Sequence, residues 1–425
     1  MTQATPATAG TNAVMYNPFE PGFAADPYPQ YAMLRERDPV HQTPFGVTIV
    51  FGYDDVQAVL RSRHVSVDES KGSSPFDQLV ADGLGEAAAL RSPAMLNRDA
   101  PDHTRLRRLV SKAFTPNAIA ALRPRIQQLV DAALDAAEGN GEFDVIGGLA
   151  FPLPFAVISE MLGMPDGDRD QLREWSGLLV RTLEPIPDME LLPRIVAAGE
   201  AMRDHVRGVI EAKRTAPADD LLTALIAAED NGDVLSIEEL SSQVGLLFIA
   251  GHETTVNLIG NGVLALLRNP DQLAQLRDDT TVDENAIEEL LRYDPPVQMS
   301  RRITLADLEV GGCTIEAGRF VGLGLASANR DRSHFGDDAD ELDLSRPNAN
   351  EHISFGGGIH HCLGAALARI EGQIAITTFV RRFPDMALAG EPVWNGRINL
   401  RGMERLPVTL GKGGKETFPP LDPPI

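Results

Sequence analysis

The stretch that decides the fold reads Phe355-Gly356-Gly357-Gly358-Ile359-His360-His361-Cys362-Leu363-Gly364. Apolar residues then recur at helical spacing, at positions 363, 367, 370 and 374, so we expect Cys362 just before or at the start of a helix. Backbone N–H groups and the positive end of a helix stabilise a thiolate there. The glycines permit positive φ angles and let the backbone approach a flat ligand. Their convergence on Cys362 favours a chemically active thiolate over the alternative, an inert packed cysteine.

A long helix is predicted over residues 236–268. Ser236 and Glu239 form a capping box at its start, and Asn269-Pro270 ends it. At 1.5 Å per residue, this helix spans roughly 50 Å. Residues 244–250 are apolar on nearly all sides, and a helix of that kind runs through the interior of a protein. Polar residues within it are therefore candidates for buried chemistry.

The middle of this helix reads Ala250-Gly251-His252-Glu253-Thr254. Glycine inside a helix costs about 1 kcal/mol relative to alanine, and the Thr254 hydroxyl can donate to the Ala250 carbonyl and bend the helix. Together they predict a small polar notch in an apolar wall; the alternative is a simple kink with a solvated Glu253. The segment also begins the zinc motif H-E-x-x-H, but Val256 occupies the second histidine position, which argues against a zinc site.

The glycine-rich stretch resembles the haem signature of the cytochrome P-450 family, F-x-x-G-x-x-x-C-x-G. Phe355, Gly358, Cys362 and Gly364 match all four fixed positions. The resemblance implies that Cys362 is the axial ligand of the iron of haem b and that Phe355 packs near its sulfur. It also implies that His360 reaches a haem propionate.

The long helix carries a second motif of the same family, A-G-x-[DE]-T. The family places this motif over the haem face where oxygen binds. The resemblance therefore implies that Ala250 and Gly251 lie against the cofactor and that Glu253 and Thr254 are the catalytic pair that delivers protons.

A third pair, Glu289 and Arg292, is spaced three residues apart on a predicted helix. Taken alone, such a pair usually indicates a weak, exposed ion pair. The resemblance implies instead a buried structural network, in which Arg346 is the third member. The role of this network would be folding and haem retention rather than chemistry.

Other site residues are carried over by position from the same family. His103, Arg107 and Arg301 fall where family members bind haem propionates, although solvated basic residues are the alternative. The substrate wall is expected to be apolar, which implies a lipophilic substrate, and to include Leu246, Ile249, Val297, Met299 and Leu400.

Helical patterning dominates the rest of the chain, over residues 105–114, 119–137, 171–180 and 195–213. Short strands are predicted at 47–51, within 303–315 around a Gly311-Gly312 turn, and at 408–410. No linker or repeat divides the chain, so we expect one domain over residues 17–411, with tails at 1–16 and 412–425. The chain is predicted to be mainly α with a small β region, and the resemblance implies the cytochrome P-450 fold, with haem buried between the long helix and the cysteine loop.

The composition limits the class of partner. Of the 425 residues, 43% are hydrophobic and 23% are charged, which are ordinary values for a globular protein. A net charge of −23 argues against nucleic acid and anionic membranes as partners. Cys313 and Cys362 cannot form a disulfide framework, and free thiols suit a reducing cytosol. Residues 1–10 have no targeting pattern, so a cytoplasmic monomer is expected, with Cys313 as a small packed residue.

By resemblance, the activity is a monooxygenase reaction that inserts one atom of O₂ into a lipophilic small molecule. The segment 83–88 fits the dinucleotide-binding pattern G-x-G-x-x-A but does not follow a predicted strand, and the segment 322–327 lacks the third small residue, which argues against a dinucleotide site. Electrons from NAD(P)H are therefore expected to arrive through a separate ferredoxin and ferredoxin reductase. The alternatives are a haem-thiolate sensor or carrier without turnover, and a variant that uses peroxide.

A cluster of basic residues suggests where an electron donor docks on this acidic chain. Arg105, Arg108 and Lys112 are predicted to share one helix face, with Arg107 turned toward the haem. Such a patch suits a small acidic redox protein. A solvated helix face is the alternative.

Overall fold

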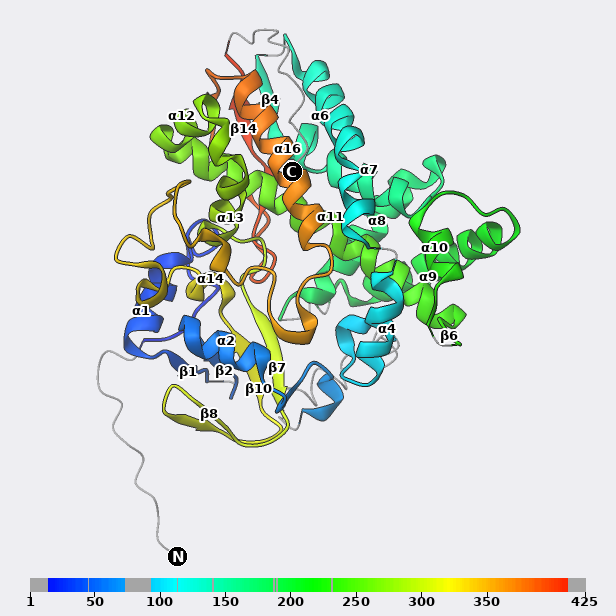
Figure 1. Cartoon of the computed structure of the whole chain (residues 1–425). Coiled ribbons are helices and arrows are strands. Elements are labelled where there is room, and N and C mark those ends of the chain that lie inside the picture. Colours follow the sequence, from blue (N-terminus) through cyan, green and yellow to red (C-terminus); the bar gives the residue numbers. More distant parts are fainter. Residues whose placement is uncertain are drawn as a thin grey trace, which may run out of the picture.

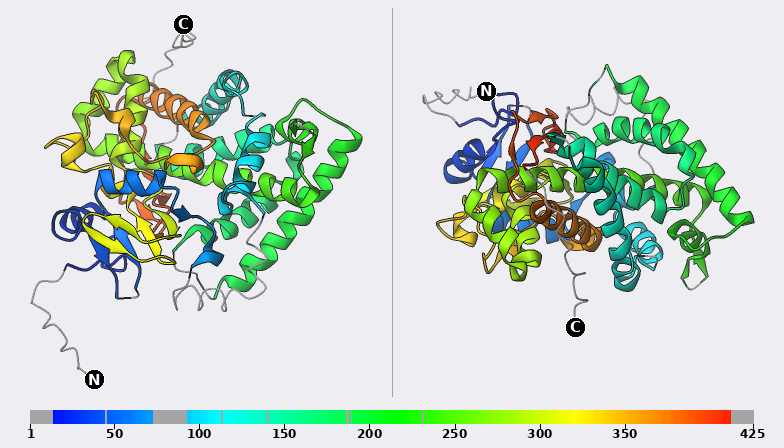
Figure 2. Two further views of the ribbon diagram at one scale, coloured as in Figure 1. Left: turned by 60° about the horizontal axis from the view of Figure 1, so that its bottom comes forward. Right: turned by 90° about the horizontal axis from the view of Figure 1, so that it is seen from above.

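Helices and a small sheet occupy different sides of the molecule (Figure 1). The sheet lies with the blue N-terminal segments at the lower left of that view, and most helices fill the upper and right parts. Both views in Figure 2 keep this separation, with the cyan and green helices on the right. The computed structural model describes residues 14–44, 46–72, 93–112, 114–139, 141–185, 188, 190–230 and 232–411. The prediction of a mainly α chain with a small β region is confirmed.

Most of the regular secondary structure of the described residues is α-helical. The helices are α1 (Tyr28–Arg37), α2 (Tyr53–Arg61), α4 (Asp102–Ser111), α5 (Pro116–Ala120), α6 (Arg123–Ala137), α7 (Pro152–Met161), α8 (Arg169–Leu179), α9 (Leu192–Thr215), α10 (Leu221–Ala227), α11 (Ile237–Arg268), α12 (Pro270–Asp278), α13 (Asp283–Tyr293), α14 (Leu325–Ala328), α15 (Arg332–Phe335) and α16 (Ala365–Arg382).

The strands are short. They are β1 (Val40–Gln42), β2 (Thr48–Val50), β3 (Val65–Ser66), β4 (Glu142–Asp144), β5 (Glu229–Asp230), β6 (Asp233–Val234), β7 (Ser300–Thr304), β8 (Leu308–Val310), β9 (Cys313–Ile315), β10 (Phe320–Leu323), β11 (Ala387–Leu388), β12 (Val393–Trp394), β13 (Met403–Arg405) and β14 (Pro407–Thr409). The pairings β2–β10, β4–β14 and β3–β7 join strands that lie far apart in the sequence. The largest sheet has the order β1-β2-β10-β7-β3. In it, β10 runs parallel to β2 and antiparallel to β7.

The long helix α11 begins and ends as predicted. Its capping box forms: the Glu239 N–H donates to Ser236 Oγ at 3.1 Å, and the Ser236 N–H donates to Glu239 Oε2 at 2.9 Å. Asn269 is the residue at its C-terminal end. The helix packs against α7, α9, α13 and α16, so it runs through the interior.

Two hydrophobic cores meet along α11. The N-terminal half contributes Val244 and Phe248 to a core shared with α4 and α7 to α10. The C-terminal half contributes Val256 and Ile259 to a core shared with α6, α13 and α16. Residues 251–254 of α11 lie between the residues that belong to the first core and those that belong to the second. The predicted notch therefore falls where the two cores meet.

The helix predicted over residues 119–137 is divided into α5 and α6. Pro124 stands in the first turn of α6. Because proline has no N–H to donate to the preceding turn, a continuous helix cannot pass through this position. The prediction of a single helix was therefore wrong at this point.

The predicted turn at Gly311-Gly312 joins β8 to β9, and both glycines have positive φ, at 55° and 77°. Cys313, the first residue of β9, is exposed, so its interpretation as a packed residue was wrong. The reason is that β8 and β9 form a separate two-stranded hairpin, in which Cys313 and Thr314 both face solvent, whereas Val310 and Ile315 are buried.

The predicted N-terminal tail, residues 1–16, includes residues that pack against the described structure. The backbone N–H of Tyr16 donates to His41 Nε2 at 3.3 Å, and its ring packs against Phe23 and Phe51. Residues 1–13, the whole C-terminal tail 412–425 and the partial motif at 83–88 lie outside the described residues.

Candidate active site

The cysteine loop places Cys362 two residues before Gly364, which caps α16, as predicted. The Cys362 N–H donates to the Phe355 carbonyl at 2.9 Å, and this bond closes the loop. Gly356 and Gly358 have φ angles of 69° and 65°, a region that favours glycine. The close approach at Gly358 is to another part of the chain rather than to a ligand, because a Cβ there would lie 2.5 Å from the Leu60 carbonyl oxygen of α2.

The helix start alone does not make the Cys362 thiol acidic. The Cys362 side chain is accessible to solvent, but the surrounding protein removes much of the water that a thiolate needs, and this desolvation raises its pKa. A hydrogen bond from the Gly364 backbone and the charges of Arg107 and Arg369 oppose the rise without cancelling it. A thiol loses its proton outright when it becomes the ligand of a metal ion. Metal ligation would therefore supply the thiolate that the resemblance implies.

Two histidines meet beside the cysteine loop. The rings of His103, on α4, and His360 lie with their centroids 4.1 Å apart. His103 Nδ1 and His360 Nε2 are buried and have no hydrogen-bond partner among the described residues. Burial lowers the pKa of His103, and burial followed by the charge of His103 lowers the pKa of His360 to about 3. Both imidazoles are therefore neutral, each with one ring nitrogen available to a ligand.

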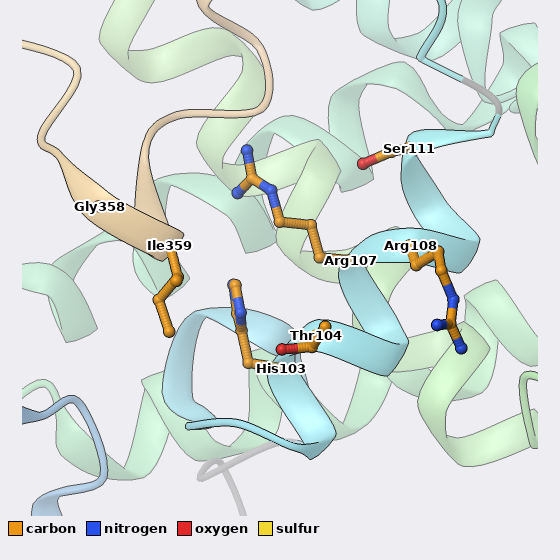
Figure 3. Close-up of a pocket in the computed structure, with 7 residues that line it drawn as sticks. All are labelled: His103, Thr104, Arg107, Arg108, Ser111, Gly358 and Ile359. Carbon is orange, nitrogen blue, oxygen red and sulfur yellow. The ribbon is translucent and has the colours of Figure 1, made fainter. Parts of the chain in front are cut away.

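Arg107 lies on the same face of α4 as His103 (Figure 3). Both point toward the segment that carries Gly358 and Ile359, whereas the guanidinium of Arg108 points away from it. Together with Thr104 and Ser111, these residues line an open pocket of about 400 Å³. The structure thus brings His103, Arg107 and His360 together.

The strand β7 carries the fourth predicted propionate contact, Arg301, which is half-buried and lies opposite Gly322 of β10. Its neighbour Arg302, which the sequence reasoning missed, is with Arg107 one of two arginines whose charges add to the effect of burial in lowering the pKa of His360. Burial lowers the pKa of Arg302 to about 10, and the charge of Asp99 opposes this shift. Adjacent residues of a strand point to opposite faces of the sheet. This alternation is a sequence signal that Arg301 and Arg302 do not both face the same site.

The hydrogen bond expected within the predicted notch of α11 is present. Thr254 Oγ1 donates to the Ala250 carbonyl at 3.0 Å. Ala250 is exposed and Thr254 is half-buried, whereas the flanking His252 and Thr255 are buried. His252 Nδ1 donates to the Phe248 carbonyl at 2.8 Å, and burial lowers its pKa, so this histidine is a neutral packed residue.

Glu253 is neither solvated nor free. Its Oε1 accepts a charged hydrogen bond from Arg397, and the two side chains are only 13% and 11% exposed. Arg397 lies 144 residues further along the chain. No local pattern in the sequence marks this partner, and the sequence reasoning missed it.

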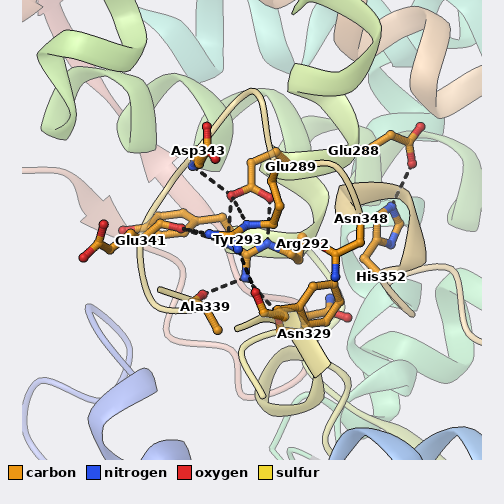
Figure 4. Close-up of polar contacts among 12 residues, drawn as sticks. Glu288, Glu289, Arg292, Tyr293, Asn329, Ala339, Glu341, Asp343, Asn348 and His352 are labelled. Atoms are coloured by element: carbon orange, nitrogen blue, oxygen red, sulfur yellow. Dashed lines mark hydrogen bonds and ion pairs between the residues drawn. The ribbon is translucent and has the colours of Figure 1, made fainter. Parts of the chain in front are cut away.

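The three residues of the predicted network meet in the interior, and Figure 4 shows two of them, Glu289 and Arg292. Arg292 donates to both carboxylate oxygens of Glu289, at 2.6 and 2.8 Å, and both side chains are 0% exposed. The remaining guanidinium N–H groups of Arg292 bind the carbonyls of Asn329, Ala339 and Glu341. Arg346 Nε donates to Glu289 Oε1 at 3.3 Å. The pair is therefore not the exposed ion pair that its spacing alone would suggest.

The five residues of the expected substrate wall come from three segments. Leu246 and Ile249 are half-buried on α11, at the edge of the core shared with α8 and α9. Val297 and Met299 are also half-buried, and Tyr16 Oη donates to Met299 Sδ at 3.9 Å. Leu400 is only 2% exposed, and its backbone pairs with Val297.

The residues around Cys362 fit a planar metal group that carries acidic substituents. An accessible thiol can bind the metal, and the unpartnered nitrogens of His103 and His360, with Arg107, can bind carboxylates. Leu363, next to the cysteine, packs on the same core as Leu246 and Ile249 of α11. The fold and this site define a haem-thiolate oxidoreductase.

The chain belongs to the cytochrome P450 family: the family model described as "Cytochrome P450" matches residues 40–391. It is 44% identical over 404 residues to cytochrome P450 107B1 of Saccharopolyspora erythraea, covering 92% of this chain and 97% of the relative. It is 42% identical over 402 residues to cytochrome P450 monooxygenase PikC of Streptomyces venezuelae, covering 92% of each. It is also 42% identical over 412 residues to the vitamin D(3) 25-hydroxylase of Pseudonocardia autotrophica, covering 95% and 98%.

A solved structure agrees with this assignment. The bacillaene polyketide synthase cytochrome P450 PksS of Bacillus subtilis superposes with a TM-score of 0.84 at 38% identity, covering 93% of this chain and 100% of that one. The predicted family, fold and enzyme class are therefore confirmed: the protein is a cytochrome P450 monooxygenase, and the family's cofactor is a haem. Among the described residues, no helix is long and apolar enough to cross a membrane.

Proposed function

We propose that this enzyme uses haem b, with Cys362 as the iron ligand, to insert one atom of O₂ into a lipophilic small molecule in the cytoplasm. The observation that carries the proposal is the notch in α11, where the Thr254 hydroxyl binds the Ala250 carbonyl beside the carboxylate of Glu253. When bound, the haem supplies the oxygen chemistry, and a thiolate ligand favours cleavage of the O–O bond.

Protons are the part of this reaction that the chain itself must supply. We assign Thr254 to hold a proton donor at the notch, since its hydroxyl is anchored on the Ala250 carbonyl and can accept a further hydrogen bond. Glu253, one residue away, is the group that carries protons to it. A protein that only senses or carries a ligand has no need of such a pair.

His103, Arg107, His360 and Arg301 are the proposed propionate contacts. The first three converge beside the cysteine loop, and the unpartnered ring nitrogens of the two histidines support their assignment. Ala250 and Gly251 would lie against the haem face, and Phe355 beside the cysteine.

The substrate is proposed to contact Leu246, Ile249, Val297 and Met299, which are half-buried and apolar. Leu400 would support the wall without contacting the substrate directly, because its side chain is buried and its backbone pairs with Val297. A relative named vitamin D(3) 25-hydroxylase supports a lipophilic class of substrate without identifying the carbon skeleton.

Electrons are proposed to come from NAD(P)H through a separate ferredoxin and ferredoxin reductase. A ferredoxin and a ferredoxin reductase from another source therefore provide the test. With them, the wild-type enzyme should consume O₂ and oxidise at least one member of a panel of macrolides, terpenoids, steroids and fatty acids. If products form only when hydrogen peroxide is added, the enzyme is instead a peroxide-using variant.

Ligation is tested separately from turnover. Reduced wild-type protein with CO should show the red-shifted Soret band of thiolate ligation, and Cys362→Ala should abolish it. Cys313→Ala is the matched control, because the second cysteine is exposed on the β8–β9 hairpin. An unchanged thiolate band in Cys362→Ala would refute the assignment.

A further inference from the structure

A short loop, residues 397–400, lies between two carboxylates from distant parts of the chain. On one side, Arg397 binds Glu253 of α11. On the other side, Glu184 binds the three backbone N–H groups that follow Arg397. Arg397, which contacts the proposed proton carrier Glu253, thus directly precedes the three residues whose N–H groups Glu184 binds.

Glu184 holds this loop through its backbone. Oε2 accepts from the Ile398 and Asn399 N–H groups at 2.7 and 3.0 Å, and Oε1 accepts from the Leu400 N–H at 3.0 Å. The Asn399 side chain returns a bond from Nδ2 to the Leu183 carbonyl at 3.0 Å. Hydrogen bonds to an ionised acceptor are roughly twice as strong as those between neutral groups, so this is a firm attachment.

Glu184 belongs to the connection between two helices that cover α11. It follows the 3-10 turn Val180–Leu183, which continues α8, and it precedes α9. Both helices share a core with the N-terminal half of α11, at whose edge Leu246 and Ile249 lie. Glu184 therefore connects residues 397–400 to the helices that share a core with Leu246 and Ile249 of the proposed substrate wall.

The same loop is joined to the second segment of that wall. The Asn399 carbonyl accepts from the Gln298 N–H at 2.9 Å, and Asn399 Oδ1 accepts from the Met299 N–H at 3.0 Å. Val297 and Leu400 form a backbone bridge. Two hydrogen bonds and a backbone bridge therefore join residues 297–299 to the loop.

At the other end of the loop, the hold of Arg397 on Glu253 is specific. Arg397 Nε is buried with no hydrogen-bond partner among the described residues. Its backbone N–H is fixed by Asn395 Oδ1 at 3.0 Å, which sets the direction in which the side chain leaves the loop. Glu253 is the carboxylate that its guanidinium reaches.

We propose that residues 397–400 couple the α8–α9 connection and the wall segment 297–299 to the proton carrier. In this arrangement Arg397 is a positioning residue for Glu253, and Glu184 is a positioning residue for the loop. The proposal rests on the proposed function only in treating Glu253 as the group that carries protons.

The first measurement concerns the loop alone, in the haem-loaded enzyme. In Glu184→Gln, the amide group of glutamine presents N–H donors where a carboxylate oxygen accepted, so at least one of the three bonds is lost. Backbone amides 398–400 should exchange hydrogen at least about tenfold faster than in the wild type. Glu174→Gln, the same change at an exposed site on α8, should leave their exchange unchanged. Equal exchange in Glu184→Gln and wild type would overturn the role of Glu184.

The second measurement concerns proton supply and needs no known substrate. NADPH oxidation with O₂ and a heterologous ferredoxin and reductase is compared in H₂O and D₂O. Arg397→Met should slow it at least about threefold and enlarge its solvent isotope effect, because a misplaced Glu253 delivers protons more slowly. Arg397→Lys should restore part of the rate, since lysine keeps the charge. An unchanged isotope effect in Arg397→Met would reduce Arg397 to a structural role.

The coupling itself is tested by combining the two changes. If Glu184 acts on Glu253 through Arg397, Glu184→Gln slows the wild type but adds nothing in the Arg397→Met background. Independent, multiplicative effects would overturn the coupling. Failure of the proposed function looks different, because the wild type itself would then show no O₂-dependent NADPH oxidation.

Discussion

Thr254 shows at the residue scale how a local pattern creates a site. Its hydroxyl is held on the Ala250 carbonyl one turn earlier, in a helix whose flanking residues are buried. A side chain in this position offers an oriented hydroxyl without leaving the helix. The function that we propose for it depends on that orientation.

We predict that Thr254→Ala still binds haem and consumes O₂, but releases more peroxide and less oxidised product. The reason is that loss of the hydroxyl removes the group that holds the proton donor in place for proton transfer. The quantity to measure is product formed per NAD(P)H oxidised, with any substrate from the panel that is turned over. Thr254→Ser keeps the hydroxyl and should stay close to wild type. A ratio for Thr254→Ala equal to that of wild type would remove Thr254 from proton delivery.

A second residue, Glu371, is a buried carboxyl that the proposed chemistry does not use. It lies on α16, 1% exposed, and neither of its oxygens has a hydrogen-bond partner among the described residues. Burial raises its pKa to about 8, although the nearby Thr255 hydroxyl lowers it somewhat. Glu371 is therefore protonated in the folded state at neutral pH.

This pKa has a consequence for stability. Between about pH 4.5 and pH 8 the folded chain keeps a proton on Glu371 that the unfolded chain has lost, so the free energy of unfolding falls as pH rises through this range. We predict that Glu371→Gln loses less stability than wild type between pH 5 and pH 8, by about 1 kcal/mol or more. Urea unfolding at both pH values measures this difference. Parallel pH dependence in the two proteins would contradict it.

How far the site could be predicted depended on whether the information was local. The position of Cys362 before a helix and the Thr254 bond to Ala250 follow from residues a few places apart, and both predictions were confirmed. Arg397 and Arg302 reach the site through tertiary packing: no local pattern marks Arg397, and strand alternation is the one local signal that concerns Arg302. The pKa of Cys362 is raised because desolvation outweighs the helix start, a balance that spacing alone cannot supply.

At the scale of elements, hydrophobic periodicity located the helices better than it located their interruptions. The capping box fixed the start of α11, whereas Pro124 divided a segment whose apolar pattern continues from α5 into α6. The network of Glu289, Arg292 and Arg346 lies at this scale too. It fastens α13 to the segment 329–346 through carbonyls that have no partner in a helix or strand.

We predict that Glu289→Gln lowers the free energy of unfolding by about 3–5 kcal/mol, because it leaves the fully buried Arg292 without its carboxylate. The variant should also retain less haem after purification, as the resemblance to the family implies. Urea unfolding and the haem-to-protein ratio are the two measurements. Glu284→Gln, an exposed change on the same helix, should stay within about 0.5 kcal/mol of wild type. A stable Glu289→Gln variant with full haem content would show that the network is dispensable.

Charge is the property that belongs to the whole molecule. With a net charge of −23, the protein repels acidic partners everywhere except where cations gather. The predicted patch on α4 needs one correction: Arg105 is bound to Glu239 and, at 3.3 Å, to Asp233, so its charge is largely neutralised. Arg108 and Lys112 are exposed, and Arg108 lines the pocket beside the cysteine loop.

We predict that Arg108→Glu slows electron transfer from an acidic ferredoxin while leaving substrate binding and the CO spectrum intact. Reversing this charge weakens the local attraction that steers the donor toward the cysteine side of the haem. Salt should slow the wild type and narrow the difference between the two proteins, since charges are screened beyond about 10 Å at 0.1 M ionic strength. Stopped-flow reduction at two salt concentrations measures both effects.

The matched control for Arg108→Glu is Arg277→Glu, the same charge reversal at an exposed position on α12, which lies away from α4 (Figure 1). Net charge changes equally in the two variants, so a general electrostatic effect would slow both. A docking role predicts that only Arg108→Glu is slow at low salt. Equal rates for Arg108→Glu and wild type under those conditions would exclude this part of α4 from the docking surface, and equal slowing of both variants would assign the effect to total charge.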